Sequence, residues 1–232
     1  MNSGAIAIFV KTPGRSPLKT RLAADTGAAW ALQWYALACS AVAEVAGQTA
    51  RAAGAEVYWA VAEADALAAA PWSGLPCLAQ GDGGLGARLA RVHATLVARH
   101  GAGVLLGADT PQLEAFDLQQ ALDWLKPAEA RQCLGPATDG GFWLYGSNRS
   151  AVAARWEALP WSQTHTAHAF RAAQAEAGAW LELPMRRDVD TVTDLDACLE
   201  ALRALPAPTP AQSALRDWMQ SQPPARGGVQ NA

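Results

Sequence analysis

The chain has 232 residues, of which 51% are hydrophobic, so it is long enough to bury a complete core. Only 17% of the residues are charged and the formal net charge is -3, which excludes a disordered chain and a basic nucleic-acid-binding surface. Four widely spaced cysteines without a C-x-x-C pair exclude a zinc site of the usual spacing and a disulfide framework. No apolar run reaches the length of a membrane span and no signal-peptide pattern is present, so we expect a cytoplasmic protein.

Strand-like and helix-like segments alternate along the whole chain. Ala5–Val10 is an unbroken apolar run, typical of a central parallel strand, and a loop with two prolines follows at residues 11–18. The alanine-rich stretch from residue 19 to about 51 predicts a helix in two pieces, broken near 25–27. Further strands are predicted at 56–61, 75–79, 103–107, 132–135, 141–146 and 180–183, and helices at 85–99, about 118–125, twice between 146 and 180, and about 192–204.

This alternation predicts an α/β fold, a three-layer α/β/α sandwich with a mainly parallel sheet and right-handed crossovers. Residues 1–205 are expected to form one domain. In residues 206–232 we expect a proline-rich linker at 206–210, then a short helix to about residue 220. Residues 222–232 have no apolar pattern and are expected to form a mobile tail.

Asp109 ends the apolar strand at 103–107 and precedes Pro111 by two residues. In open α/β sheets ligands bind outside the carboxyl ends of the strands, so an acid there faces a crevice. A carboxylate at that place is a natural oxygen ligand for a divalent cation that carries phosphates. The alternative is a helix cap, because Asp and Thr before Pro are favoured at helix starts.

The loop after the first strand is basic, with Lys11, Arg15, Lys19 and Arg21 within eleven residues. A loop that leads to a helix N-terminus can bind an anion, and lysine or arginine adds charge. The single glycine excludes a Walker loop. A merely solvated basic loop is the alternative.

Three further loops after predicted strands carry unusual residues. Four glycines in residues 81–86 allow a backbone to approach a flat ligand, although Asp82 could simply cap the next helix. Residues 138–141 combine an acid with two glycines. Asp188 and Asp190 can face one cation from an extended backbone, and a capping role for Asp190 or Thr191 is equally natural.

Aromatic and histidine residues give weaker signals. Trp161 lies in a loop and could line a pocket, whereas Trp143 in an apolar strand is expected in the core. His165 and His168 have a spacing that can bind metal, but without a third ligand we interpret them as surface residues. The sequence lacks the G-x-S-x-G pattern of a nucleophile elbow.

Five segments occur in order: K-T-P-G-R-S-P-L-K-T-R-L, G-D-G-G-L-G-A-R-L, L-G-A-D-T-P, G-P-A-T-D-G-G-F-W-L-Y-G and D-V-D-T-V-T-D-L. Together they resemble the DUF2064 family, also called glycosyltransferase-like or transferase 1, rSAM/selenodomain-associated proteins. The resemblance spans residues 5 to about 200. It implies the fold and chemistry of the GT-A, nucleotide-diphospho-sugar transferase superfamily, which includes molybdenum-cofactor and F420-pathway nucleotidylyltransferases. Residues 1–205 would then form a GT-A-like nucleotide-binding transferase domain.

The residues and the resemblance together define the expected site. The resemblance implies that the metal ligands are Asp109, Asp190 and Asp188, and that the catalytic residues are Asp109, Asp190 and Lys19. The expected nucleotide-binding residues are Lys11, Arg15, Lys19, Arg21, Gly83, Gly84 and Gly86. The expected acceptor side comprises Asp139, Gly140, Gly141 and Trp161.

We therefore expect an Mg²⁺- or Mn²⁺-dependent transferase that uses a nucleotide-sugar or nucleoside triphosphate donor and a small-molecule acceptor, without nucleic acid or membrane. Glycosyl transfer is slightly favoured, because the first loop lacks the paired glycines of the molybdenum-cofactor enzymes. The alternatives are a nucleotidylyltransferase and a non-catalytic nucleotide-binding protein that kept the fold. The sequence leaves the donor base, the acceptor and the oligomeric state open.

Overall fold

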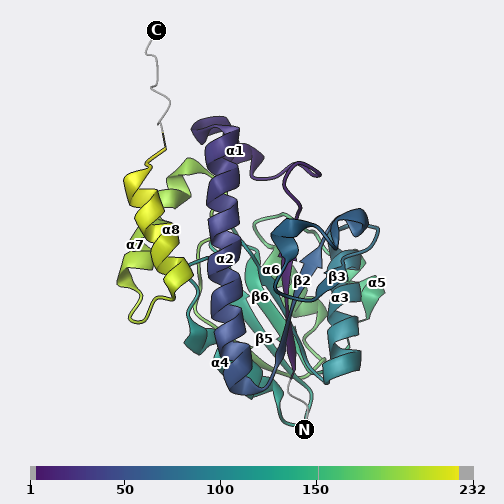
Figure 1. Cartoon of the computed structure of the whole chain (residues 1–232). Coiled ribbons are helices and arrows are strands. Elements are labelled where there is room, and N and C mark those ends of the chain that lie inside the picture. Colours follow the sequence, from purple (N-terminus) through teal and green to yellow (C-terminus); the bar gives the residue numbers. More distant parts are fainter. Residues whose placement is uncertain (1–3, 151, 225–232) are drawn as a thin grey trace.

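The computed structural model of the chain describes residues 4–150 and 152–224. Its centre is a single seven-stranded sheet in the order β3-β2-β1-β4-β6-β5-β7 (Figure 1). The strands are β1 (Ala5–Val10), β2 (Glu56–Val61), β3 (Cys77–Ala79), β4 (Gly103–Gly107), β5 (Arg131–Pro136), β6 (Phe142–Ser147) and β7 (Ala179–Glu182). Each lies where the sequence predicts a strand, within two residues at either end.

The middle of the sheet is parallel. β1 pairs in parallel with β2 on one side and with β4 on the other, so that Phe9 lies opposite Gly107 and Val10 opposite Val61. The carboxyl ends of these strands therefore meet at one edge of the sheet. β6 is antiparallel to both β4 and β5, while β5 and β7 are parallel. The sheet is mainly parallel, as predicted, with one reversed strand.

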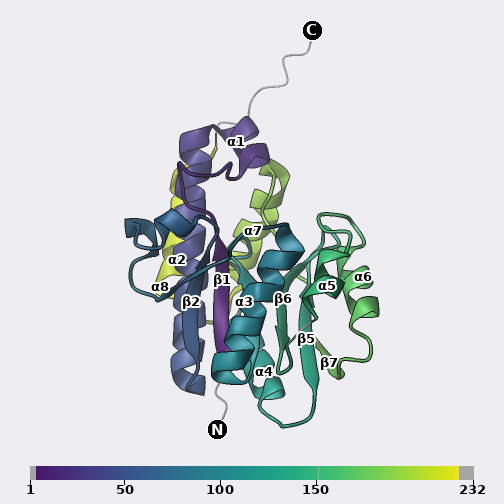
Figure 2. The same cartoon turned by 90° about the vertical axis from the view of Figure 1, so that its right-hand side faces the viewer.

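Helices cover both faces of the sheet, which confirms the three-layer arrangement (Figure 2). The first layer contains α1 (Thr20–Thr26), α2 (Ala28–Ala53), α4 (Ala115–Leu125), α7 (Val192–Ala204) and α8 (Pro210–Ser221). The second contains α3 (Leu85–His100), α5 (Ala153–Glu157) and α6 (Thr166–Ala173). In the part of the chain that the structure describes, no helix is long and apolar enough to cross a bilayer.

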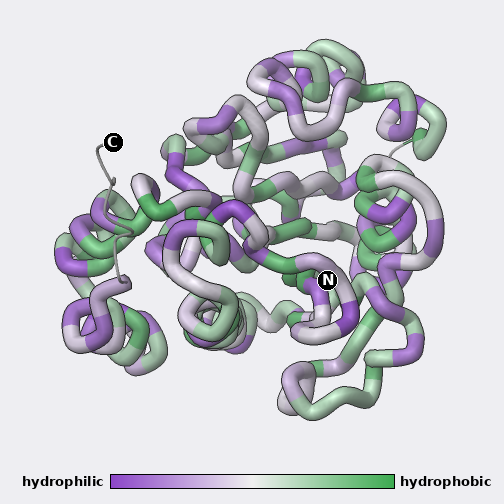
Figure 3. Tube along the Cα trace, turned by 90° about the horizontal axis from the view of Figure 1, so that it is seen from above, coloured by the Kyte–Doolittle hydropathy of each residue, from purple (hydrophilic) through white to green (hydrophobic). Residues whose placement is uncertain are grey.

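The alternation of side chains along β1 explains how helices pack on both faces of one sheet. Ile6 and Ile8 point into the core beneath α2, whereas Ala5 and Ala7 point into the core beneath α3. The small alanines leave room for α3 to approach the sheet closely. Seen from above, hydrophilic and hydrophobic residues alternate along the outer helices, as expected for amphipathic elements (Figure 3).

The C-terminal helix α8 shares the core of the preceding residues. Leu215 and Met219 are buried in the same cluster as α2, and the rings of Trp218 and Trp30 lie 4.8 Å apart between centroids. The side-chain amide of Gln212 donates hydrogen bonds to the carbonyl oxygens of Pro111 and Leu113, both at 2.9 Å. α8 thus supports the segment that follows Asp109. Most of the tail expected to be mobile, residues 225–232, lies outside the described residues.

His93 in α3 is fully buried against Tyr145 and Trp156, and burial lowers its pKa from 6.5 to about 4. Between these values the unfolded chain binds a proton that the folded chain does not, so stability falls as the pH drops from 6.5 towards 4. The expected loss is roughly 3 kcal/mol. Denaturant unfolding at several pH values should show a smaller loss over this window in His93→Phe. Identical pH profiles for both proteins would contradict a neutral buried His93.

Candidate active site

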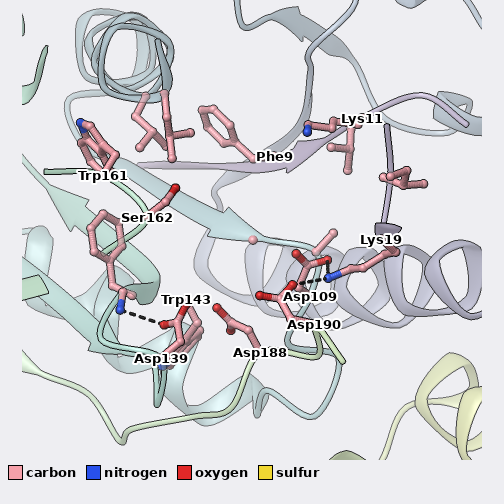
Figure 4. Close-up of a pocket in the computed structure, with 18 of the residues that line it drawn as sticks. Phe9, Lys11, Lys19, Asp109, Asp139, Trp143, Trp161, Ser162, Asp188 and Asp190 are labelled. Atoms are coloured by element: carbon pink, nitrogen blue, oxygen red, sulfur yellow. Dashed lines mark hydrogen bonds and ion pairs between the residues drawn. The ribbon is translucent and has the colours of Figure 1, made fainter. Parts of the chain in front are cut away.

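A cavity of about 480 Å³ lies at the carboxyl ends of β1 and β4 (Figure 4). At this point the chain order of the strands reverses, because β2 and β3 lie on one side of β1 and β4 on the other. Loops that leave neighbouring strands in opposite directions open a crevice there, and α/β proteins bind ligands in such crevices. One half of the cavity is lined by charged side chains and the other half by apolar and aromatic ones.

Asp109 lies two residues beyond β4 and lines the charged half of the cavity. Its carboxylate Oδ1 is 2.9 Å from the ammonium Nζ of Lys19. Its carbonyl oxygen accepts a hydrogen bond from the backbone N–H of Val189 at 3.0 Å, which ties the end of β4 to the segment before α7. The next helix starts at Ala115, after Glu114 as the capping position, so Asp109 is not a helix cap.

Lys19 joins the acids of two different segments. Its Nζ lies 2.9 Å from Asp109 Oδ1 and 3.3 Å from Asp190 Oδ1, and it donates to the carbonyl oxygen of Val189 at 2.6 Å. The side chain is only 5% exposed, whereas those of Asp109 and Asp190 are 38% and 33% exposed. Burial opposes the charge of this ammonium, but the two carboxylates outweigh burial and raise the pKa of Lys19 above 10.5.

Asp190 is free to face the cavity because another residue caps α7. The carboxylate Oδ2 of Asp194 accepts hydrogen bonds from the backbone N–H groups of Asp190 and Thr191, at 3.1 and 2.9 Å. Thr191 occupies the capping position. The carboxylate of Asp190 instead pairs with Lys19 and, at 2.7 Å, with the exposed guanidinium of Arg21. The capping of α7 therefore does not use the carboxylate of Asp190, which lines the cavity.

Asp188 lies deeper than the other acids. Burial raises the pKa of its carboxyl to about 7, and the negative charges of Asp109 and Asp139 add to that rise. The hydroxyl of Thr110 donates a hydrogen bond to Asp188 Oδ1 at 2.5 Å and partly opposes it. Asp188 thus gives up its proton less readily than an exposed aspartate, because it is buried near two other carboxylates.

The turn between β5 and β6 forms the next wall. Asp139 lines the cavity, and its Oδ1 accepts a hydrogen bond from the N–H of Gly141 at 2.8 Å. Gly140 has a φ of +90° and packs against the backbone of Thr164, while its carbonyl oxygen accepts a hydrogen bond from Ala167 N at 2.8 Å. This turn therefore holds the segment before α6 in place.

Trp161 and Ser162 line the apolar half of the cavity, as Figure 4 shows. The indole N–H of Trp161 donates to the carbonyl oxygen of Trp156 at 2.7 Å, and its ring lies 6.0 Å from that of Phe142. Ser162 has a φ of +60°, a left-handed conformation that serine rarely adopts. Trp143 is buried in the core, as expected, and His165 and His168 are exposed.

Several residues expected at the site do not line the cavity. Arg15 pairs with the exposed Asp65 instead. Gly83 and Gly84 lie in the loop before α3 and do not line the cavity, although Gln80 before them and Leu85 after them do. Gly86 is buried, and a Cβ there would overlap the carbonyl oxygen of Trp156 and the indole of Trp161. The lack of a side chain at Gly86 therefore lets α3 pack closely against the Trp156–Trp161 segment. Gly140 likewise has a packing role.

Other cavity residues were not anticipated. Gln80 follows β3 and is buried, with its amide N–H groups bound to the carbonyl oxygens of Val10 and Ala60, and its Oε1 accepting from Arg88 at 3.3 Å. Tyr35 in α2 accepts a hydrogen bond from Lys11 N at 3.0 Å. A polar residue directly after a predicted strand was a usable signal for Gln80. Nothing in the helical pattern around Tyr35 and Arg88 distinguishes them from core or surface residues.

The divalent metal that the sequence resemblance implies fits the donor chemistry. Asp109 and Asp190 offer hard carboxylate oxygens that already share one positive charge, the ammonium of Lys19. Over residues 4–150 and 152–224, however, no three or more His, Cys, Asp or Glu side chains are grouped to hold a metal. Mg²⁺ is usually bound by one or two carboxylates, and water and substrate phosphates supply its remaining ligands.

Solved structures share this fold. One from Desulfovibrio desulfuricans G20, described as a "putative nucleotide-diphospho-sugar transferase", is 25% identical with a TM-score of 0.77, covering 95% of this chain and 96% of that one. CMP:2-keto-3-deoxy-manno-octonic acid synthetase, complexed with CTP, is 21% identical with a TM-score of 0.51, covering 87% and 97%, a likeness of fold alone. Rv0371C of Mycobacterium tuberculosis H37Rv, complexed with manganese, is 19% identical with a TM-score of 0.47, covering 85% and 98%, too remote to support an inference.

The fold is therefore that of the nucleotide-diphospho-sugar transferases. A family model described as "Uncharacterized protein conserved in bacteria (DUF2064)" matches residues 41–163, more than half of the chain. This chain belongs to the DUF2064 family. No curated protein matches it.

Proposed function

We propose that this protein is a metal-dependent transferase whose donor is a nucleotide-sugar or a nucleoside triphosphate, with glycosyl transfer favoured. The observation that carries the proposal is the convergence of Asp109, Asp190 and Lys19 at the carboxyl edge of β1 and β4. The similarity of the fold to that of a putative nucleotide-diphospho-sugar transferase supports a transfer reaction at this site.

Each part of the cavity suits one part of such a substrate. Asp109 and Asp190 would hold the divalent cation, which when bound would neutralise charge on the departing phosphate group. Lys11, Lys19 and Arg21 would bind the phosphate oxygens by charge-assisted hydrogen bonds. The aromatic wall at Trp161 would exclude water from the reacting groups, and Asp139 would orient a hydroxyl of the acceptor.

The first loop favours a diphosphate over a triphosphate donor. Two of its backbone N–H groups are already bound within the protein, Lys11 N to the hydroxyl of Tyr35 at 3.0 Å and Thr12 N to Glu63 Oε2 at 2.8 Å. A loop that cradles a triphosphate presents such N–H groups to the phosphates. Here the phosphate contacts depend mainly on side chains, which supports a nucleotide-sugar donor and glycosyl transfer.

A thermal-shift screen of nucleotide-sugars and nucleoside triphosphates, each with Mg²⁺ or Mn²⁺, tests the donor. A true donor at 100 times its dissociation constant stabilises the fold by about 2.7 kcal/mol, or roughly 5–10 °C for a chain of this length. The shift should be larger with the metal than with EDTA. If nucleotide-sugars, triphosphates and free nucleotides all leave the melting temperature unchanged, the proposed donor class is wrong.

The reaction is then assigned by its products. Glycosyl transfer releases a nucleoside diphosphate, whereas nucleotidyl transfer releases pyrophosphate. Chromatography of the reaction mixture, after the donor has been incubated with candidate acceptors, therefore distinguishes the two reactions. Tight donor binding without either product over a broad acceptor panel would favour the non-catalytic alternative.

A further inference from the structure

Lys19 occupies the position between Asp109 and Asp190 that a cation bound by both acids would take. Its Nζ is within 3.3 Å of an oxygen of each, and the side chain is almost fully buried. Arg21 also touches Asp190 but is 70% exposed and does not reach Asp109. A single ammonium from within the chain therefore already bridges the two acids, although it balances only one of their two negative charges.

The backbone of Lys19 shows that this position is imposed by its contacts. Its φ of 46° and ψ of 41° lie in the left-handed region, and it shares a positive φ with just one other non-glycine among the described residues, Ser162. A lysine remains in this region only where its surroundings hold it there. The two ion pairs and the hydrogen bond to Val189 O stabilise this backbone conformation.

A divalent cation and the ammonium of Lys19 cannot both lie between the two carboxylates, because their charges repel at contact distance. Metal binding there requires Lys19 to withdraw. The withdrawn ammonium needs another anion, and the phosphates of a donor held by Lys11 and Arg21 of the same cavity would provide one. The metal, in turn, would gain phosphate oxygens as further ligands.

We propose that Lys19 and a divalent cation occupy the Asp109–Asp190 pair in alternation, so that metal and donor phosphates bind cooperatively through exchange of the partner of Lys19. The inference rests on the proposed function, because it takes the two acids as the metal ligands. By linkage, whatever factor the phosphates add to metal affinity the metal adds to phosphate affinity. Without phosphate, Lys19 keeps metal affinity low.

The test is Mn²⁺ binding to Lys19→Met without nucleotide, followed by electron paramagnetic resonance or calorimetry. Removal of the competing ammonium should tighten Mn²⁺ binding at least tenfold relative to the unmodified protein. Lys126→Met is the matched control, since it removes the same charge from a lysine that pairs with Asp123 and does not line the cavity. It should change Mn²⁺ affinity less than twofold. Unchanged or weaker binding in Lys19→Met overturns the alternation.

A second measurement uses the unmodified protein and does not depend on the folding of a variant. The chain has three lysines, Lys11, Lys19 and Lys126, so an amine-reactive reagent read by mass spectrometry reports on each. The protein is labelled in two arms, one that retains Mn²⁺ and pyrophosphate as the probe and one from which both are removed before labelling. Labelling of Lys19 should differ severalfold between the arms, whereas labelling of the exposed Lys126 should be the same in both. Constant Lys19 labelling in both arms contradicts the exchange.

The outcomes separate this inference from the proposed function. Metal-dependent donor binding with no gain of Mn²⁺ affinity in Lys19→Met refutes the alternation and leaves the metal role of Asp109 intact. If Asp109→Asn binds Mn²⁺ as the unmodified protein does, or if neither the unmodified protein nor Lys19→Met binds Mn²⁺ at millimolar concentration, the metal role and the alternation both fail.

Discussion

Replacing Asp109 by asparagine is expected to abolish metal-dependent nucleotide binding. The amide keeps the shape of the side chain but removes the negative charge next to β4, one of the two carboxylates that would hold the metal. Loss of a direct ligand should exceed the 10- to 100-fold effects of outer-sphere changes, so we expect on the order of 100-fold or more. Calorimetric titration of the donor found by screening, with Mn²⁺, measures the loss.

The fold should tolerate this change. Lys19 keeps Asp190 and the carbonyl oxygen of Val189 as partners, so the free energy of unfolding should fall by only about 1 kcal/mol or less. Asp82→Asn is the matched control, an acid in another loop after a strand that does not line the cavity. Equal donor affinity in both variants would show that Asp109 does not bind the metal.

The carboxyl edge of the sheet could be predicted from the sequence because its signals are local. The apolar runs of β1 and β4 identify buried parallel strands, and such strands deliver their following residues to one edge. Asp109 therefore follows from its own strand. Asp190 lies within a short D-V-D-T segment whose second acid reaches the same edge because Val189 N bonds to Asp109 O.

The pairing of Lys19 could not be predicted, since it depends on contacts about 170 positions away in the chain. A lysine before a helix indicates an exposed phosphate contact, and nothing local reveals that its backbone is left-handed or that its ammonium is buried. The place of β6 in the sheet is similar. Its residues predict a strand, but its insertion between β4 and β5 in the opposite direction is decided by tertiary packing.

The glycine-rich loops show why composition alone misassigns roles. Glycine permits close approach of any atom, ligand or protein, and the sequence does not tell which. At Gly86 the approaching group is the Trp156–Trp161 segment, and at Gly140 it is the backbone of Thr164. Neither glycine lines the cavity, but each allows the close packing of segments that do line it.

Gly140→Ala is expected to be strongly destabilising. A methyl group there would overlap the carbonyl of Thr164 and lie 2.6 Å from its Cα, and the φ of +90° is itself unfavourable for alanine. Because the obstacle is backbone, the turn must separate from the segment before α6. We expect a loss of about 3–5 kcal/mol in the free energy of unfolding, measured by urea denaturation.

Gly74→Ala separates the steric overlap from the cost of the backbone conformation. Gly74 has a φ of +91° but no atom within 4 Å of a Cβ, so this variant should lose only about 1–2 kcal/mol. The difference between the two variants measures the contact with Thr164. Gly140 is next to Asp139, and its contact with Thr164 holds the segment that carries Ser162, both of which line the cavity. Gly140→Ala should therefore weaken donor or acceptor binding even where it is fully folded, whereas Gly74→Ala should not. Equal losses of stability, with binding intact in both, would show that the turn does not hold this wall of the cavity.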